Sequence, residues 1–354
     1  MRRFSMRPEH LQVIQFAFAL MFATGLAAAA FAPTIVSAQD AAAQGSETRT
    51  GETQPPDASV DNVLPAPTAA PQSLEDFDPR ADAAYGAYQR GLYLTAFGLA
   101  LTRANTGDPA AQTLIAELYD KGLGVARDRA EAVAWYSLAA QKDYPPAQFA
   151  YAIKLLEGEF VESDRKQARE LLEKAAAAGH PVAKFNLAQM LVDERPGYAG
   201  FRDAFPYYRG AANAGVADAY YAMAQIYAEG LGAEQDIEEA RQWLVKAAQA
   251  GIDTAQVELG IWLANGKGGE KNEKAAFGWI SRAARGGNVI AQNRLAKMLV
   301  IGIGTEPDKI EGAKWHIIAR RAGRSDPWLD DFLTTVDDQT RQKALERANR
   351  WPSG

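Results

Sequence analysis

The hydrophobic pattern of residues 217–252 is that of two amphipathic helices separated by a short polar break. Apolar side chains recur every three or four residues in the first run, as at Ala219, Met223 and Ile226, and again in the second run, as at Ala240 and Leu244. Each helix alone would leave its apolar face in water. The pattern therefore predicts a helical hairpin that must pack against further helices.

The break between the two runs contains specific stop and start signals. Gly230 and Gly232 suit the left-handed backbone that ends a helix, and Asp236 followed by Glu239 has the spacing of a capping box that starts the next one. Asn272 keeps the cap residue without the acidic partner. The same box is predicted at Asp128 with Glu131, Asp164 with Gln167, Asp236 with Glu239, and Asp308 with Glu311.

The hairpin recurs with a period of 36 residues, and no insertion or deletion interrupts it between Pro109 and Arg324. The third and eighth positions of each copy are alanine, with one glycine at Gly260, which allows helices to approach closely. The twenty-seventh position is large, as at Trp243, and the thirty-first is alanine throughout, so large and small residues can interdigitate. A fixed period of this length predicts a helical solenoid. The six copies begin at Pro109, Pro145, Pro181, Ala217, Asp253 and Val289.

The repeated residues A-x-x-x-[LM]-[AG]-x-x-[YL]-x-x-G-x-G, D-x-x-[EQ]-A and W-[YL]-x-x-A-A-x-x-G resemble the Sel-one-like repeat (SLR), a longer relative of the tetratricopeptide repeat. The resemblance implies an all-α, right-handed superhelical α-solenoid of about seven hairpins with a C-terminal helical cap. It also implies an adaptor that binds a protein partner, as in bacterial envelope proteins that restrain sensor kinases. It implies neither an enzyme nor a cofactor.

Residues 1–38 have the composition of a secretory signal. Arg2, Arg3 and Arg7 precede an apolar run from Leu11 to Ala32, and small residues place the predicted cleavage after Ala38. The run is also long enough to span a bilayer, so an uncleaved inner-membrane anchor is the alternative, and only then would the membrane be a partner. We therefore expect a protein of the periplasm or cell envelope.

Residues 39–80 form a predicted disordered linker with six prolines and a net charge of −6. The chain as a whole also has a net charge of −6, and the signal contributes +2, so residues 81–354 have a net charge of only −2. A nearly neutral solenoid argues against nucleic-acid binding. The absence of cysteine excludes disulfides and thiol chemistry.

The ends of the array and its third copy depart from the repeat. Residues 81–108 are predicted to be a divergent N-terminal capping repeat, residues 109–324 the six repeats, and residues 325–354 a C-terminal helical cap. In the third copy, Pro206 lies where the second helix should already be running, so that helix is predicted to start late, at Asp203 or Ala204. The preceding loop, from Glu194 to Asp203, is a hinge, a contact site or the result of sequence drift.

Few residues suggest chemistry. Ser163 and Lys166 match the S-x-x-K pattern of penicillin-recognising serine enzymes, but no S-D-N or K-T-G accompanies them, so an envelope hydrolase is only an alternative. His316 occupies a position that is apolar or aromatic in other copies and is predicted to pack inside a helix pair. His180 lies in a turn with no metal-ligand cluster around it. We therefore predict no catalytic, cofactor or metal residues; a membrane-anchored assembly factor is the other alternative.

The fifth and ninth positions of each first helix form the candidate binding surface. By resemblance to tetratricopeptide arrays, these positions line the concave face, where aromatic rings supply contact area and amides supply orientation. Packing of Phe149, Phe185 and Tyr221 between neighbouring first helices is the structural alternative, and the two roles can coexist. We name as the ladder Phe149, Ile153, Phe185, Gln189, Tyr221, Gln225, Val257 and Ile261.

Overall fold

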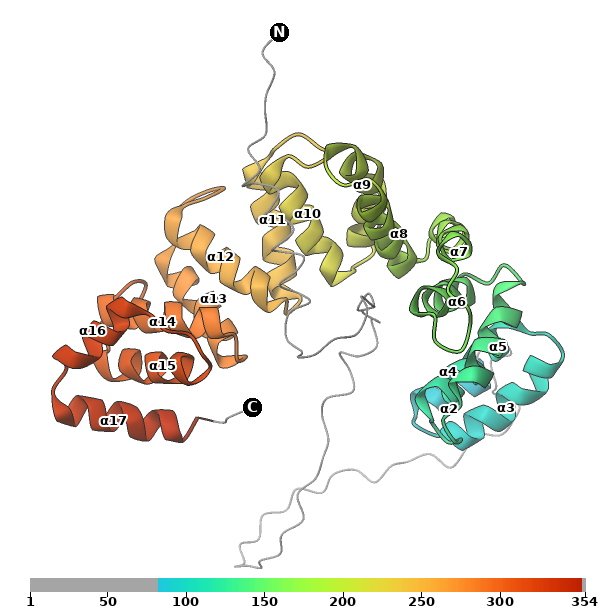
Figure 1. The fold of residues 1–354 in the computed structure, drawn as a ribbon, viewed down its shortest axis with the longest axis horizontal. Coiled ribbons are helices and arrows are strands. Elements are labelled where there is room, and N and C mark those ends of the chain that lie inside the picture. The colour runs from blue at the N-terminus through green and yellow to red at the C-terminus, as the bar shows by residue number, and fades with distance from the viewer. Residues whose placement is uncertain (1–81, 352–354) are drawn as a thin grey trace, which may run out of the picture. The chain divides into compact units, whose positions relative to one another are not determined.

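The computed structural model describes residues 82–351, and within that range every regular element is a helix. Neighbouring helices pack in pairs as hairpins within the two parts of the chain described below (Figure 1), as α4 does with α5 and α10 with α11, which confirms the predicted all-α solenoid. The chain divides into two compact units, one up to Leu171 and one from Leu172. The first contains α2 (Ala83–Gln89), α3 (Tyr93–Asn105), α4 (Pro109–Lys121), α5 (Arg129–Ala140), α6 (Pro145–Glu157) and the first half of α7 (Arg165–Ala177).

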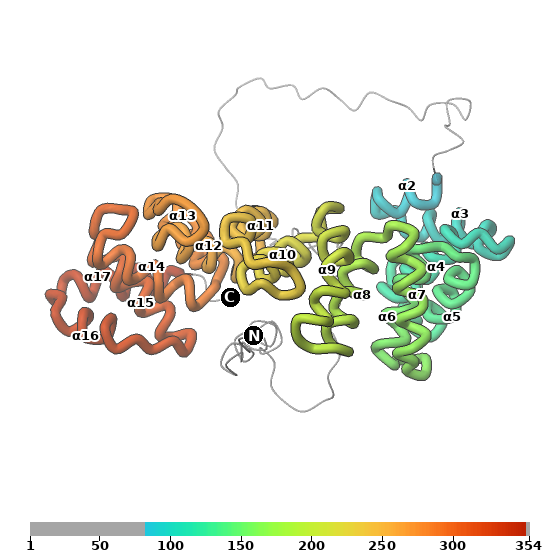
Figure 2. The backbone as a smooth tube through the Cα atoms, turned by 90° about the horizontal axis from the view of Figure 1, so that it is seen from above, coloured from blue at the N-terminus to red at the C-terminus, as the bar shows by residue number. Residues whose placement is uncertain are grey.

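The second unit continues the same alternation of first and second helices. In Figure 2, the second helices α11 and α13 lie toward the upper edge, and the first helices α10 and α12 lie below them. The unit contains, after the end of α7, α8 (Pro181–Glu194), α9 (Tyr198–Asn213), α10 (Ala217–Glu229), α11 (Ile237–Gln249), α12 (Asp253–Asn265), α13 (Glu273–Arg285), α14 (Val289–Ile301), α15 (Lys309–Arg321), α16 (Pro327–Thr335) and α17 (Asp338–Asn349).

The repeated small residues lie where helices approach most closely. Ala219 and Ala255 at the third position are completely buried, and Ala224 at the eighth is 1% exposed. At Gly260, a Cβ atom would lie 2.6 Å from a side-chain carbon of Ile280 on α13. Since heavy atoms cannot approach so closely, a larger residue at these positions would separate the two helices of a hairpin.

The predicted helix caps form, but only one half of the capping box does. The Asp236 side chain accepts a hydrogen bond from the Glu239 amide at 2.9 Å, as an N-cap should. The Asp236 amide, however, donates to the carbonyl of Tyr227 on the preceding helix, not to the Glu239 side chain. Glu239 instead accepts a hydrogen bond from the indole of Trp243 at 2.9 Å. Asp236 therefore caps α11 through its side chain, and its amide closes the loop by bonding to the Tyr227 carbonyl of the preceding helix.

The two glycines of the Gly-x-Gly loop have different roles. Gly230 is the left-handed C-cap of α10, with φ 68°, and its amide donates to Ile226. Gly232 also has a positive φ of 70°, and a Cβ atom there would lie 2.2 Å from the amide nitrogen of Arg202 on α9. The second glycine thus lets each loop pack against the second helix of the preceding repeat. The sequence pattern did not reveal this contact.

Phe160 occupies the position of that second glycine in the second repeat. It keeps the left-handed backbone, with φ 60°, although such a conformation costs an L-residue about 1–2 kcal/mol. Its side chain is 61% exposed, and the neighbouring Glu159 forms an ion pair with Arg129 at the start of α5, 2.9 Å away. The loop therefore keeps its place beside the preceding repeat and turns the phenyl ring toward solvent.

The prediction that the second helix of the third repeat starts at Asp203 or Ala204 is wrong. Helix α9 begins at Tyr198 and includes Pro206 in its interior. Burial of Phe201 and Tyr208 on one side of α9 stabilises the early start. Pro206 and Arg202 are both exposed, so water can hydrate the Arg202 carbonyl that the proline leaves without its helical donor. The loop predicted from Glu194 to Asp203 is accordingly reduced to Arg195–Gly197.

Both ends of the described range are helical. Helices α2 and α3 lie within the predicted N-terminal capping repeat, and α16 and α17 lie within the predicted C-terminal cap. Helix α17 packs along α15 (Figure 1), where Arg347 forms an ion pair with Glu311 at 2.7 Å. The Trp315 and Trp351 rings meet edge to face at 4.7 Å. Helix α17 therefore covers the face of α15 that a further repeat would otherwise cover. Residues 1–80, with the predicted signal and linker, lie outside the described residues.

Candidate functional site

The ladder residues differ widely in exposure. In the first unit, Ile153 on α6 is 6% exposed, whereas Phe149 is partly exposed. In the second unit, Phe185 and Val257 are 9% and 7% exposed, and the Phe185 ring contacts the buried Tyr208 ring of α9 edge to face at 5.7 Å. These buried members pack in the core of their units. The surface available to a partner is smaller than the sequence alone indicates.

The partly exposed ladder residues in the second unit are Gln189, Tyr221, Gln225 and Ile261. Two of them are held by one carboxylate on the next first helix. The Tyr221 hydroxyl donates to Oε2 of Glu258 at 3.1 Å, and the Gln225 amide donates to the same oxygen at 2.9 Å. Tyr221 and Gln225 lie one turn apart on α10, while Glu258 lies on α12. This polar cluster links repeats four and five and fixes both side chains.

The environment of Glu258 favours its protonated form. Burial raises the pKa of Glu258, and the charge of Glu229 raises it further, while the bonds from Tyr221 and Gln225 and the charge of Lys267 act in the opposite direction. Burial and the Glu258 charge also raise the pKa of the Tyr221 hydroxyl, so Tyr221 remains a donor. The site is therefore a half-buried acceptor with two fixed donors, and it has no nucleophile or base arranged for catalysis.

The same ladder positions make a second link at the end of the array. Asn293 and Lys297 of α14 occupy the fifth and ninth positions, and both contact Asp326, the N-cap of α16, at 3.1 and 2.6 Å. The ladder positions thus connect adjacent helices as well as facing solvent.

Sequence reasoning missed the acceptor Glu258 because it stands at the sixth position, where the other copies have Leu114, Ala150, Asn186, Ala222 and Arg294.

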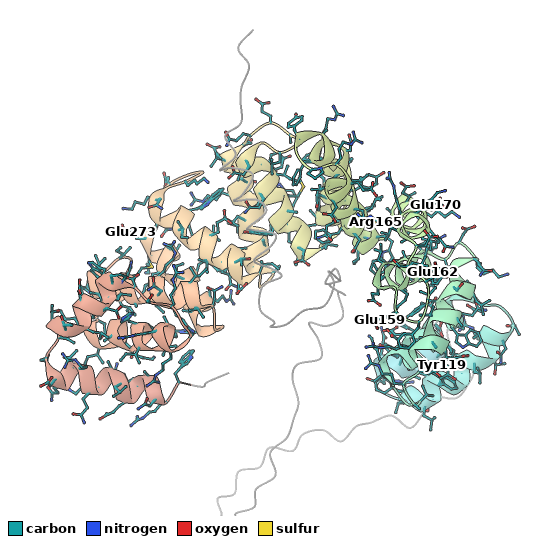
Figure 3. All side chains as sticks on the ribbon, viewed as in Figure 1. Tyr119, Glu159, Glu162, Arg165, Glu170 and Glu273 are labelled. Atoms are coloured by element: carbon teal, nitrogen blue, oxygen red, sulfur yellow. The ribbon has the colours of Figure 1, made fainter. Side chains whose placement is uncertain are left out.

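The weak S-x-x-K match finds no site around it. Ser163 lies in the turn before α7 and Lys166 in its first turn, and both are exposed. Figure 3 labels the neighbouring residues Glu162 and Arg165, which are also exposed. Nothing in this geometry supports a nucleophile and base in a cleft, so the structure adds no support to the hydrolase alternative.

The two histidines of the described range are tied into helix structure. His180 is the N-cap of α8, where its Nδ1 accepts a hydrogen bond from the Ala183 amide at 3.1 Å, and burial lowers its pKa. His316 is completely buried in α15, as predicted, and its Nε2 lies 2.9 Å from Asp330 of α16. Residues 82–351 contain no group of three or more His, Asp or Glu side chains placed to hold a metal ion.

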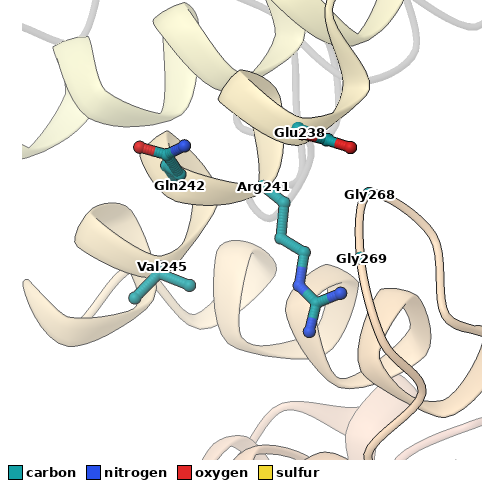
Figure 4. Close-up of a pocket in the computed structure, with 6 residues that line it drawn as sticks. All are labelled: Glu238, Arg241, Gln242, Val245, Gly268 and Gly269. Carbon is teal, nitrogen blue, oxygen red and sulfur yellow. The ribbon is translucent and has the colours of Figure 1, made fainter.

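A cavity of about 360 Å³ that is open to the surface lies against α11, which is a second helix of its hairpin (Figure 4). It is lined by Glu238, Arg241 and Val245 together with Gly268 and Gly269 of the next repeat's loop. The Arg241 guanidinium donates to the Glu270 carbonyl at 3.1 and 3.2 Å. This arginine fastens the loop to α11, so the cavity is a by-product of the stacking contact.

In the part of the chain that the structure describes, no helix combines the length and apolarity needed to cross a bilayer.

The model of the Sel1 repeat family matches five segments, residues 109–144, 145–180, 217–252, 254–288 and 289–323, which together make up half of the chain. The divergent third copy falls outside these segments.

Two solved structures are similar to the chain. A Sel1 repeat protein from Oxalobacter formigenes is 27% identical, with a TM-score of 0.57, over 69% of this chain and 96% of that protein. The protein c5321, a protective antigen of uropathogenic Escherichia coli strains with an SLR fold, is 24% identical with a TM-score of 0.50, over 73% of this chain and 64% of its own. No curated protein sequence matches.

Proposed function

Because the chain belongs to the Sel1 repeat family of helical scaffolds that mediate protein–protein interaction, we propose that it is an exported scaffold that holds a protein partner in the periplasm or cell envelope. Export is supported by the basic and apolar pattern of residues 1–38. If the signal is not cleaved, residues 39–80 would be a linker between the membrane anchor and the scaffold.

The observation that supports a binding role for the ladder is the geometry of α10 and α12. Tyr221 and Gln225 are partly exposed, yet Glu258 holds both in single orientations. A side chain that is already fixed loses little conformational entropy when a partner binds, so a preordered tyrosine and amide suit a recognition surface. Ile261 adds a partly exposed apolar side chain on α12.

The partner is sought by crosslinking in the native envelope, followed by purification of the full-length chain. We compare the wild type with a ladder variant, Tyr221→Ser with Ile261→Ser, and with a control variant, Val245→Ser, on the second-helix side. Phe185 is left unchanged because its ring packs in the core. Circular dichroism must show equal helicity for all three proteins.

We expect the ladder variant to lose a specific set of crosslinked proteins that the wild type and the Val245→Ser control both retain. Recovery of the same proteins by all three chains would refute binding at the ladder. Mass spectrometry of the mature N-terminus tests export separately. A chain that begins at Gln39 supports secretion with cleavage, whereas an intact Met1 in the membrane fraction would instead favour the anchored alternative.

A further inference from the structure

The second helix of the N-terminal capping repeat, α3, exposes a face of leucines. Leu92, the N-cap of α3, is 49% exposed, and Leu94 and Leu99 are 71% and 45% exposed. The other exposed residues on this side of the helix are small and uncharged: Thr95, Gly98 and Thr102. We call these six residues the leucine face. An exposed apolar patch of this kind usually marks a surface that something covers.

The other copies have polar residues where the leucine face has leucine. Leu92 stands at the N-cap position, which is aspartate or asparagine in five of the six repeats, and it makes no side-chain cap bond. Of the six residues that correspond to Leu94, four are charged: Lys166, Arg202, Glu238 and Lys274. Terminal repeats normally have a polar outer face, so leucine here needs an explanation other than exposure to water.

The described chain begins beside this face. Asp82 caps α2 and forms an ion pair with Arg103 of α3, 2.9 Å away, and Arg103 lies one turn after Leu99. Helix α2 has 7 residues and α3 has 13, so α2 is too short to accompany the last turns of its partner. The residues that precede Asp82 therefore leave from the part of α3 that α2 does not cover.

The sequence just before Asp82 contains a pair of large apolar residues. Leu74 and Phe77 are three residues apart, with Glu75 and Asp76 between them. In one helical turn, residues three apart share a side, so both apolar side chains can face α3 while the two carboxylates face water.

This pair is also within reach of the leucine face. Five residues separate Phe77 from Asp82 and can span up to about 18 Å when extended. The nine residues from Leu94 to Arg103 extend only about 14 Å along the helix axis. Phe77 can therefore contact any part of the face without displacing Asp82 from its ion pair.

The size of the leucine face favours a segment of the same chain over a second copy. Its three leucines together expose roughly 300 Å², against about 800 Å² per partner in a standard protein–protein interface. A tethered segment is already at a high effective concentration, so a smaller area can hold it. A second copy would also bring another net charge of −6, from its own residues 39–80, to the same end of the array.

We propose that residues 73–78 bind back onto α3, with Leu74 and Phe77 packed on the leucine face. The segment then supplies the outer cover that the short helix α2 does not provide, and it closes this end of the array to a second copy and to a partner's helix. This contact lies outside the ladder, so its test does not depend on the proposed function.

The test uses the absence of cysteine from the chain, which lets one introduced pair report proximity. Asp76→Cys and Thr102→Cys place one thiol beside the apolar pair and one on the leucine face, and a short bis-maleimide joins them when the segment is bound. The test change is Leu74→Ser with Phe77→Ser. The matched control is Val60→Ser with Val63→Ser, which removes two apolar side chains farther from α2. All chains are purified with residues 39–80 intact.

We expect the test change to slow crosslinking within the chain at least fivefold and to speed hydrogen exchange in α3, while the control changes either by less than twofold. Leu94→Ser should slow crosslinking as well, because it removes the other side of the contact, and its high exposure makes it harmless to the fold.

Two other results would overturn the proposal. Equal crosslinking rates in the unchanged pair, the test and the control would show that Leu74 and Phe77 do not hold the segment on α3. Crosslinks between chains, with a mass by light scattering that rises to that of a dimer with concentration, would show that a second copy covers the leucine face instead.

Discussion

The contact of Gly232 with α9 makes a quantitative prediction about how the repeats are joined. A Cβ atom at Gly232 would lie 2.2 Å from the Arg202 nitrogen and 2.3 Å from the Phe201 carbonyl carbon, and φ is 70°. The left-handed backbone costs alanine about 1–2 kcal/mol. Displacing the loop from α9 costs roughly a further 1–3 kcal/mol, as overpacking does elsewhere. Gly232→Ala should therefore lower the free energy of unfolding by about 3 kcal/mol.

Two other glycines separate the backbone cost from the steric cost. Gly251 has φ 96°, and a Cβ atom added there would have no neighbour within 4 Å, so Gly251→Ala should cost only the backbone contribution, about 1–2 kcal/mol. Gly278 lies within α13 with open space around it, so Gly278→Ala should raise stability by about 0.5–1 kcal/mol. The predicted order of stability is Gly278→Ala, wild type, Gly251→Ala and Gly232→Ala.

Urea denaturation followed by circular dichroism gives the order of the midpoints. Repeat arrays can unfold in parts, so native-state hydrogen exchange locates the loss. Protection should fall in α9, α10 and α11 when Gly232 is changed. Equal destabilisation by Gly232→Ala and Gly251→Ala would refute the argument, because it would show that the approach of the loop to α9 adds nothing to the backbone cost.

Three further changes test other parts of the structure. Pro206→Ala should stabilise the chain by about 2 kcal/mol in urea denaturation, since an exposed helix interior regains a hydrogen bond; a loss would contradict the assignment of α9. Phe160→Gly should stabilise by about 1 kcal/mol in the same assay by removing backbone strain, and no gain would mean that the ring makes a compensating contact. Glu258→Gln should stabilise the chain at neutral pH. Because the pKa of Glu258 is raised in the folded state, the folded chain binds this proton more tightly than the unfolded chain does. The free energy of unfolding of the wild type therefore falls as the pH rises through the folded-state pKa of Glu258. The difference in stability between the wild type and Glu258→Gln should vanish in acid.

Local signals in the sequence predicted most helix boundaries because they act through the backbone of the same segment. Asp236 was expected to cap a helix, and α11 begins at the next residue; Gly230 was expected to end one, and it is the C-cap of α10. At Pro206 the local signal gave the wrong start for α9, because burial of Phe201 and Tyr208 outweighs the hydrogen bond that the proline removes. Tertiary burial of this kind cannot be read from one segment.

Contacts between repeats were harder to predict than the repeats themselves. The second loop glycine recurs, so the sequence shows that this position is constrained. A left-handed backbone and a close approach to the preceding repeat would each explain a glycine there, and the structure shows that both apply. The capping-box spacing of Asp236 and Glu239 likewise predicted the N-cap but not the bond from Glu239 to Trp243. A repeated residue identifies a constraint without saying which partner imposes it.

A repeat pattern describes the positions that all copies share, so it does not draw attention to residues that differ between copies. Binding residues are to be sought among these differing residues. Positions common to all copies, such as the alanines at Ala219 and Ala247, are buried and explain stacking. Glu258 interrupts a column of mostly small or apolar residues, and its carboxylate fixes both Tyr221 and Gln225. In a solenoid, a half-buried carboxylate that one copy alone has at this position needs a reason beyond the stacking common to all copies, and orienting Tyr221 and Gln225 for a partner would supply one for Glu258.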